Sequence, residues 1–294
     1  MNTASRLRSL LRQEGMIVAP GAYDSLTAKL IERAGFAALY MTGAGTAASL
    51  GFPDFGLVTM SEMAANAGRI AASVDLPLVA DADTGYGNEL NTVRTVREYE
   101  ARGVAALHIE DQDFPKRCGH LDGKRIIPRE DWLVKIRAAS CARRDPSFTI
   151  IARTDARAVA GFDEAIARAN AALAEGADMA FVEAPQSLEE IAAIPRLVAG
   201  PCLLNVVRGG KSPEIPLADG ERLGYKLAIV PGLLVKTVIA ACEEMLAELR
   251  ASGRYPRPLK ELSVREMFAR VGADEWEALG ERLSKATAAR EAAQ

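Results

Sequence analysis

Short apolar runs alternate with longer helical patterns eight times along this 294-residue chain. The runs lie at residues 16–20, 37–43, 77–83, 105–111, 149–155, 179–184, 202–207 and 227–231. Near-continuous apolar runs are typical of parallel strands that are covered on both faces. Because each run is followed by a helical pattern, the sequence predicts an α/β fold, a (β/α)₈ TIM barrel, rather than an open doubly wound sheet.

The eight repeats end near residue 253, so we expect residues 1–253 to form one catalytic barrel domain. Residues 254–294 contain two more helical patterns, LKELSVREMFARVG and DEWEALGERLSKATAAR, with apolar residues at helical spacing. Apolar helix faces are stable only when they are covered. We therefore expect this C-terminal helical tail to pack on the barrel or on a neighbouring subunit.

Composition excludes several classes of function. The net charge is −3 and aromatic residues make up only 5% of the chain, which argues against a nucleic-acid-binding surface. No apolar run approaches the ~20 residues needed to span a membrane. The N-terminal residues form an amphipathic helical pattern without the apolar segment of a signal peptide. Four cysteines in a chain of this length do not indicate a disulfide framework, so we expect a cytoplasmic protein with reduced thiols.

Carboxylates gather at the predicted ends of neighbouring strands, where barrel enzymes carry their active sites. Asp81 and Asp83 are two residues apart and point to the same face, Glu110 ends the next strand, and Asp54 follows the second strand. Converging carboxylates repel one another unless a cation joins them. Oxygen ligands with room for water and substrate suit Mg²⁺ or Mn²⁺, so these four residues are the predicted metal site. Capping of helices or pairing with Lys and Arg is the simpler alternative for any one of them.

The stretch DFPKRCGHLDGKRIIP, residues 113–128, follows the fourth strand and carries a cysteine, a histidine and several cations. Cys118 and His120 lack a second Cys/His pair, which makes zinc binding improbable. Lys116, Arg117 and the strand residue Arg153 are candidate ligands of substrate carboxylates. The glycine pairs after the second and third strands lack the third glycine of a dinucleotide fingerprint, so NAD binding is not expected.

The segments ADADTGYG, IEDQ, KRCGH and IARTDA occur in an order and spacing that resemble the isocitrate lyase/phosphoenolpyruvate mutase superfamily. The pentapeptide KRCGH is similar to the signature of its carbon–carbon lyase branch, which includes 2,3-dimethylmalate lyase and methylisocitrate lyase. The resemblance covers roughly residues 5–250. It implies a Mg²⁺-dependent enzyme and a barrel whose last helix is exchanged with a neighbour, giving a homotetramer built from helix-swapped dimers.

The resemblance also implies roles for individual residues. Asp81 and Asp83 match the metal-associated acidic pair of the family, and Asp54 and Glu110 match carboxylates that reach the metal directly or through water. Cys118 matches the catalytic cysteine, with Arg153, Tyr40, Lys116 and His120 as its catalytic neighbours. The residues that would bind substrate are Thr42, Gly43, Ala44, Asp81, Arg153, Glu183 and Asn205.

One segment departs from methylisocitrate lyases. After the seventh strand the chain reads NVVRGGKSP, residues 205–213, which is more similar to dimethylmalate lyase, oxaloacetate-hydrolysing and carboxyphosphonoenolpyruvate mutase relatives. We expect cleavage of a 2-hydroxy di- or tricarboxylate to pyruvate or glyoxylate plus a carboxylate. Oxaloacetate hydrolysis or decarboxylation and phosphonomutase chemistry are the alternatives within the fold, and a non-catalytic barrel is the remote one.

The expected chemistry is a retro-aldol cleavage that ends with protonation of a carbanion by the Cys118 thiol. The base that takes the substrate's hydroxyl proton is left open among Tyr40, a metal-bound hydroxide and a carboxylate. Lys116, Arg117 and His120 are expected to lower the pKa of Cys118, which would work against this role. The distance of these cations from the sulfur is therefore a question for the structure.

Overall fold

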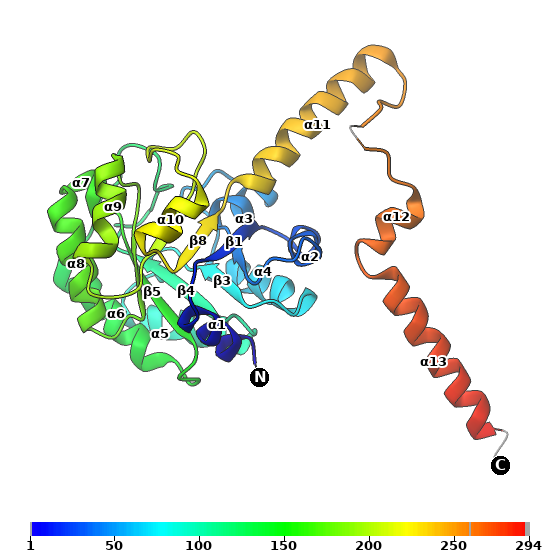
Figure 1. The fold of residues 1–294 in the computed structure, drawn as a ribbon, viewed down its shortest axis with the longest axis horizontal. Helices are drawn as coiled ribbons and strands as arrows, with labels where there is room; N and C mark the ends of the chain where they lie inside the picture. The colour runs from blue at the N-terminus through cyan, green and yellow to red at the C-terminus, as the bar shows by residue number, and fades with distance from the viewer. Residues whose placement is uncertain (1, 259, 292–294) are drawn as a thin grey trace. The chain divides into compact units, whose positions relative to one another are not determined.

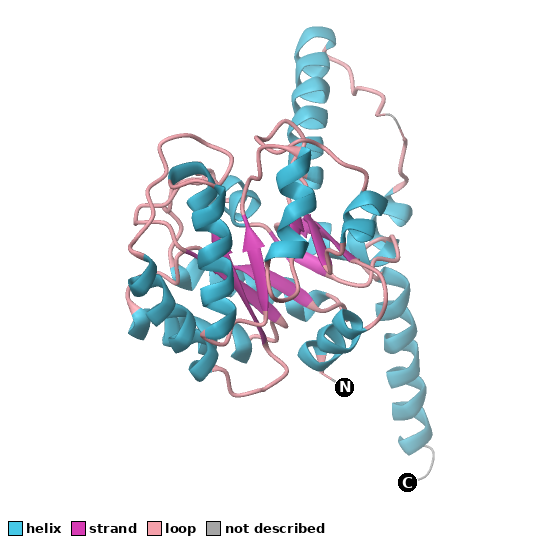
Figure 2. Ribbon diagram, turned by 60° about the vertical axis from the view of Figure 1, so that its left-hand side comes forward, coloured by secondary structure: helices cyan, strands magenta, loops and turns pink. Residues whose placement is uncertain are grey.

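The computed structural model describes residues 2–258 and 260–291. Within them, eight parallel strands form one sheet in the order β6-β5-β4-β3-β2-β1-β8-β7, with helices outside it (Figures 1 and 2). The strands are β1 (Ile17–Ala22), β2 (Leu39–Met41), β3 (Leu78–Asp81), β4 (Ala106–Glu110), β5 (Thr149–Thr154), β6 (Met179–Val182), β7 (Leu203–Asn205) and β8 (Leu227–Val230). All eight predicted strands are confirmed.

A helix follows each strand, and the first seven of these helices return the chain to the start of the next strand. These helices are α2 (Ser25–Arg33), α4 (Met60–Ser73), α5 (Glu89–Ala101), α6 (Arg129–Ala142), α8 (Phe162–Ala174), α9 (Leu188–Leu197), α10 (Leu217–Leu223) and α11 (Leu233–Ser252). Two short helices are inserted after strands, α3 (Gly43–Ser49) and α7 (Ala156–Val159), and α1 (Thr3–Arg12) precedes the barrel. The predicted (β/α)₈ barrel is therefore correct.

The sheet closes on itself between β6 and β7. β1 pairs with both β2 and β8, so the first and last strands are neighbours. The opposite seam is joined by a single parallel bridge between Ala180 and Cys202, with the Ala180 N–H donating to the carbonyl of Pro201 at 2.9 Å.

Helix α1 covers the end of the barrel opposite the carboxyl ends of the strands. The Asn2 side chain caps the helix by accepting from the Ser5 N–H at 2.8 Å. Leu7 is fully buried and packs with apolar strand residues such as Val79 and Ile151. Arg8 pairs with Asp178, which precedes β6, at 2.8 Å. Because this end is filled, the functional site must lie at the other end of the strands.

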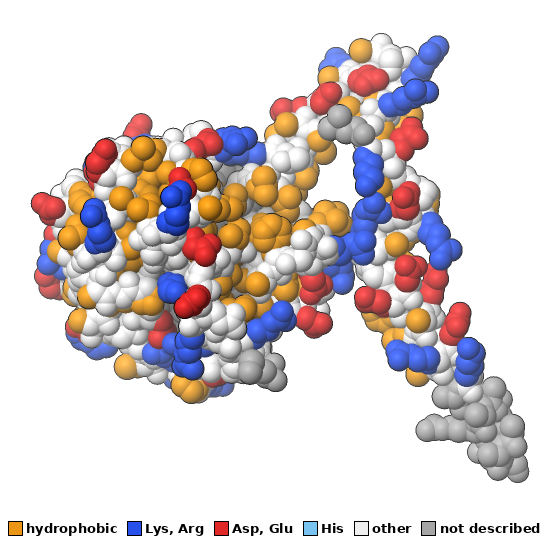
Figure 3. Space-filling view, in the orientation of Figure 1, with side chains coloured by type: hydrophobic (Ala, Val, Ile, Leu, Met, Phe, Trp, Pro, Cys, Tyr) orange, Lys and Arg blue, Asp and Glu red, His pale blue; other side chains and the backbone are white. Residues whose placement is uncertain are grey.

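The chain divides into two compact units, and the division between Thr237 and Val238 falls inside α11 rather than after it. The second unit contains the rest of α11 with α12 (Val264–Ala269) and α13 (Ala273–Glu291), which are the two helices expected in the tail. α11 has no buried residue, and Trp276 in α13 is 73% exposed. Figure 3 shows hydrophobic side chains along these helices, interspersed with charged ones. No helix in the described part of the chain is both long and apolar enough to cross a membrane.

Candidate active site

Buried acidic side chains lie at the carboxyl ends of β3 and β4. Asp81 is the last residue of β3 and Glu110 is the last residue of β4. Asp83 follows in a left-handed backbone conformation, with φ of 45°, which non-glycine residues adopt rarely and often at functional sites. Its own N–H donates to Asp81 Oδ1 at 2.9 Å, and its carbonyl accepts from the Glu110 N–H at 2.9 Å. This turn therefore fixes the three predicted metal-site acids relative to one another.

Lys116 from the 113–128 loop supplies a cation to this acidic cluster. Its Nζ lies 2.5 Å from Asp54 Oδ1 and 2.7 Å from Asp83 Oδ1, and the side chain is almost completely buried. Burial opposes the charge on Lys116, but the surrounding carboxylates outweigh it and raise the pKa of the ammonium. Burial also raises the pKa of Asp83, to about 6, and raises that of Glu110. The ammonium partly offsets the repulsion that four converging acids would otherwise suffer.

Asp81 is held by backbone and ring groups on its other side. Its Oδ2 accepts from the Gly43 N–H at 3.2 Å, and Tyr40 Oη lies 3.4 Å from the same oxygen. Tyr40 Oη is also 2.8 Å from His108 Nε2. Burial lowers the pKa of His108 to about 4, so its ring is neutral at physiological pH. Burial opposes ionisation of Asp81, yet its pKa is lowered; with His108 uncharged, Lys116 and Arg153 supply this stabilisation at neutral pH.

Arg153, from β5, is paired along both edges of its guanidinium group. Its Nη1 lies 3.0 Å from Glu110 Oε2, and its Nε donates to Asp155 Oδ2 at 3.0 Å. The guanidinium also lies over the Phe181 ring, 5.3 Å from its centroid. Burial disfavours its charge, but the acids around it raise its pKa further. Arg153 is thus a fixed positive charge at the centre of the site.

Glu183 and Asn205 come from the ends of β6 and β7. The Asn205 side-chain amide donates to Glu183 at 3.1 Å, and His120 Nε2 lies 3.0 Å from Glu183 Oε1. Burial alone would raise the pKa of Glu183, but Arg153 and His120 outweigh it and lower that pKa. Glu183 is therefore an ionised carboxylate beneath the loop.

The 113–128 loop is folded down over these groups. The Gln112 side chain binds the Arg117 backbone at both its N–H and its carbonyl, at 3.0 and 2.8 Å. Lys124 Nζ donates to Asp155 Oδ1 at 2.7 Å and also to the Gly119 carbonyl. A Cβ on Gly119 would overlap the side chains of Glu183 and Arg153. The glycine is required here because the loop backbone touches the site directly.

The Cys118 thiol has its pKa raised, contrary to the sequence-based expectation. Burial is the largest cause and outweighs the hydrogen bond from the His120 backbone and the charge of Arg153. The cations expected to lower it are directed elsewhere. Lys116 is held by Asp54 and Asp83, and Arg117 lies over the Phe55 ring at 5.8 Å. The thiol stays protonated at neutral pH, as a proton donor must be.

The donor set fits a hard divalent cation in its chemistry. Asp83 Oδ1 and both Glu110 carboxylate oxygens are buried and accept no hydrogen bond in the described part of the chain. Asp83 Oδ1 and Glu110 Oε2 are instead paired with the charges of Lys116 and Arg153, at 2.7 and 3.0 Å. Carboxylate oxygens are the ligands that Mg²⁺ and Mn²⁺ prefer. In the conformation described, however, no group of three or more Asp, Glu, His or Cys side chains converges on one point, and the Lys116 ammonium lies between Asp54 and Asp83.

Two predicted substrate residues make no hydrogen bond or ion pair with the acidic cluster in the part of the chain that the structure describes. The Thr42 hydroxyl caps α3 by accepting from the Gly45 N–H at 3.2 Å, and Ala44 is exposed. Three other contributors were not assigned a role from the sequence: His108, Lys124 and Asp155. His108 lies within β4 and Asp155 directly follows β5, so their positions near the ends of strands could have indicated a role in the site. Lys124 belongs to a charged stretch that gave no indication of its buried partner.

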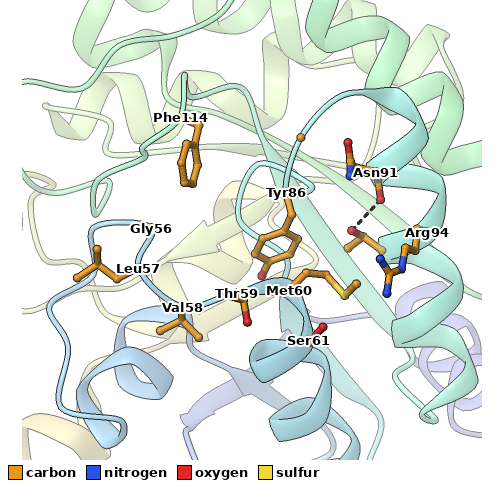
Figure 4. Close-up of a pocket in the computed structure, with 12 residues that line it drawn as sticks. Gly56, Leu57, Val58, Thr59, Met60, Ser61, Tyr86, Asn91, Arg94 and Phe114 are labelled. Carbon is orange, nitrogen blue, oxygen red and sulfur yellow. Dashed lines mark hydrogen bonds between the residues drawn. The ribbon is translucent and has the colours of Figure 1, made fainter.

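A cavity of about 580 Å³ lies beside the site, and none of the predicted site residues lines it. It is bounded by residues 56–61, by Tyr86 and by the first turns of α5, with Phe114 from the loop on one side (Figure 4). The predicted catalytic residues are buried or half-buried and do not line its walls. The predicted site residues therefore lie outside this cavity.

The fold and site together define a class: a (β/α)₈ barrel enzyme whose strand ends carry an acidic cluster covered by a loop with a protonated cysteine. A family model described as phosphoenolpyruvate phosphomutase matches residues 7–250. The chain belongs to this family, which confirms the superfamily expected from its motifs.

Named relatives are similar over most of their length. The chain is 47% identical to 2,3-dimethylmalate lyase of Eubacterium barkeri over 85% of this chain and 87% of the relative. It is 44% identical to 2-methylisocitrate lyase of Aeropyrum pernix over 92% and 88% of the two chains. Both relatives are named as lyases, which agrees with the predicted enzyme class.

Solved structures show the same fold. Oxaloacetate acetylhydrolase in complex with 3,3-difluorooxalacetate has a TM-score of 0.93 and 40% identity, covering 96% of this chain and 97% of that one. Phosphonopyruvate hydrolase in complex with oxalate and Mg²⁺ has a TM-score of 0.86 and 31% identity, covering 96% and 99%.

Proposed function

We propose that this enzyme is a Mg²⁺-dependent carbon–carbon lyase that cleaves a 2-hydroxy dicarboxylate of the 2,3-dimethylmalate type, or a 2-methylisocitrate-type tricarboxylate. The observation that carries the proposal is the half-buried thiol of Cys118, with a raised pKa, on a loop folded over Asp83, Glu183 and Arg153. A proton donor placed opposite carboxylates and a fixed cation suits a reaction that forms a carbanion. The names of the two lyase relatives support the same class.

Asp54, Asp81, Asp83 and Glu110 would hold the metal, directly or through water. When bound, Mg²⁺ or Mn²⁺ would supply Lewis acidity to the 2-hydroxy acid portion of the substrate. The Mg²⁺ and oxalate in the complex of phosphonopyruvate hydrolase support this assignment by similarity. Gly43, whose N–H donates to Asp81 Oδ2, would lie beside the same portion of the substrate.

The chain's own residues would then carry the proton transfers. As a carboxylate of the acidic cluster takes the proton of the 2-hydroxyl, the oxygen forms a carbonyl at C2. The C2–C3 bond breaks, and its electron pair moves to C3 and the adjoining carboxylate. Arg153 and Lys116 would stabilise the added charge, and the Cys118 Sγ–H would protonate C3. Tyr40 is a poor candidate for the base, because burial raises the pKa of its hydroxyl. We assign it to orienting Asp81, 3.4 Å away.

Oxaloacetate hydrolysis is the second candidate. It is favoured by the high structural similarity to oxaloacetate acetylhydrolase and by the segment NVVRGGKSP after β7. Assays with Mg²⁺ on 2,3-dimethylmalate, 2-methylisocitrate, 2-alkylmalates and oxaloacetate distinguish the two. A 2-oxo acid such as pyruvate plus a second carboxylate supports the lyase, and oxalate plus acetate from oxaloacetate supports the hydrolase. Phosphonomutase activity is tested in parallel with carboxyphosphonoenolpyruvate.

We further propose that the apolar helices after the barrel pack against another copy of this chain, giving a homotetramer of helix-swapped dimers. The tail, residues 254–294, would contribute with α11, whose exposed apolar residues include Val238, Ile239 and Leu246. Contiguous exposed apolar faces of this kind usually mark interfaces. The enzyme is expected to act in the cytoplasm on a small carboxylate, without nucleic-acid or membrane partners.

A further inference from the structure

His120 joins the 113–128 loop to the segment that follows β7. Its Nδ1 accepts a hydrogen bond from the Lys211 backbone N–H at 3.0 Å. A ring nitrogen that accepts carries no hydrogen, so the ring hydrogen lies on Nε2. That nitrogen faces Glu183 Oε1 at 3.0 Å. His120 is therefore held by a backbone donor from one loop, and a carboxylate at the end of β6 lies beside its other ring nitrogen without hydrogen-bond geometry.

The contacting segment fits closely around this ring. A Cβ on Gly210 would lie 2.5 Å from His120 Nδ1, closer than real contacts allow. Lys211 also pairs through its ammonium with Asp122 of the same loop. The segment is itself anchored by Lys236, whose Nζ donates to the Arg208 carbonyl at 2.6 Å.

We infer that Gly210 and Lys211 are positioning residues for the proton donor: they hold the loop closed by binding His120. The inference rests on the proposed function and extends it to residues that do not touch the reacting atoms. Cys118 is two residues from His120, and its carbonyl accepts from the Leu121 N–H at 2.9 Å. Fixing His120 therefore fixes the short turn that carries the thiol. Without this contact, the loop would remain anchored by Lys124 and Gln112, and its attachment on the β7 side would be reduced to the ion pair between Lys211 and Asp122.

The first test adds a methyl group to the binding segment. Gly210→Ala places a Cβ against His120, whereas Gly209→Ala adds a Cβ that meets nothing within 4 Å. The control is stringent because Gly209 has φ of 71°, so its substitution strains the backbone without touching His120. The second test compares Lys211→Pro, which removes the N–H donor, with Lys211→Ala, which loses the same ammonium but keeps the N–H.

The readout is trypsin cleavage after Arg117, an exposed residue next to Cys118, followed by mass spectrometry of the intact enzyme without substrate. Each test variant should be cleaved there ~10-fold faster than its control, because cleavage follows the population of the open loop. In lyase assays, kcat should fall by ~10-fold with little change in KM, since the donor is displaced while the substrate ligands remain.

Equal cleavage rates within both pairs would overturn the inference, whatever reaction the enzyme catalyses. Faster cleavage in either test variant supports it, so the test survives if one of the two variants does not fold. Because trypsin cleavage needs no substrate, its result is independent of the proposed function. Failure of every tested carboxylate to be cleaved would contradict the proposed function and leave the contact between His120 and Lys211 standing.

Discussion

The Gly43 N–H donates to Asp81 Oδ2 at 3.2 Å, and a Cβ on Gly43 would overlap that same oxygen. Glycine is therefore required at the start of α3 by a carboxylate from another strand rather than by a turn. Gly43→Ala should displace Asp81 and lower kcat/KM by about 100-fold, the scale expected for misplacing a catalytic group by ~1 Å. Calorimetry with Mg²⁺ should show weaker binding. Gly280→Ala adds a Cβ to open space in α13 and is the control; equal kinetics for the two variants would contradict the requirement.

Replacing the thiol tests the proton donor. Cys118→Ser should lower kcat by roughly 10²–10⁴-fold, the usual contribution of a positioned general acid. Cys141→Ser is the matched control, because Cys141 is an exposed cysteine outside the site. Steady-state assays on the best substrate of the panel provide the measurement. Near-normal turnover in the Cys118 variant would remove the cysteine from the mechanism.

The raised pKa of Cys118 predicts the alkaline side of the pH profile. A general acid works when protonated, so activity is lost as pH rises through its pKa. Because burial raises this pKa above the ordinary thiol value, the decline of kcat/KM should begin at a higher pH than an ordinary thiol would give, in the alkaline range. A decline that begins near pH 7 would show that the loop cations do lower the thiol pKa in solution.

Removal of divalent cations should abolish turnover. The enzyme treated with EDTA and then desalted should be inactive, and Mg²⁺ or Mn²⁺ should restore it, if the acidic cluster holds the metal. Added Mg²⁺ should also raise the melting temperature of the wild type, because a ligand of the folded state stabilises it. Asp81→Asn should reduce that increase. Turnover that persists without metal would rule out the acidic cluster as a catalytic metal site.

His108 should make stability depend on acid pH. Its pKa falls from the ordinary 6.5 to about 4 in the folded enzyme, so below pH 6.5 the unfolded state binds more protons. The contribution is fully present above pH 6.5 and is lost as pH falls towards 4, by roughly 3 kcal/mol. Urea unfolding of the wild type and of His108→Asn over this range measures the difference in slope. Parallel slopes would mean that His108 titrates normally.

The architecture was predictable because it depends on local patterns. Strand residues alternate with helical stretches along the chain, and each pattern is readable within about ten residues. The positions of Asp81 and Glu110 followed from the same reasoning, since both end strands of a parallel barrel. Predicting that these two residues lie close together required only the order of the strands in the barrel, which follows their order in the chain.

The electrostatics of the site could not be derived in this way. The pKa of Cys118 was expected to fall because cations are near it in sequence, but Lys116 is directed to Asp54 and Asp83 from other strands and loops. Burial then decides the sign of the shift. The contact between His120 and Lys211 joins residues 91 positions apart, and no local pattern encodes it.

The seam between β6 and β7 gives one more consequence. A single bridge joins these strands, yet Glu183 at the end of one accepts a hydrogen bond from Asn205 at the end of the other. The side chains of Glu183 and Asn205, which would face the substrate, thus also join β6 to β7, where only one bridge connects the described strands. Substitutions at these two positions that favour a new substrate must therefore also preserve the connection between β6 and β7 that closes the barrel.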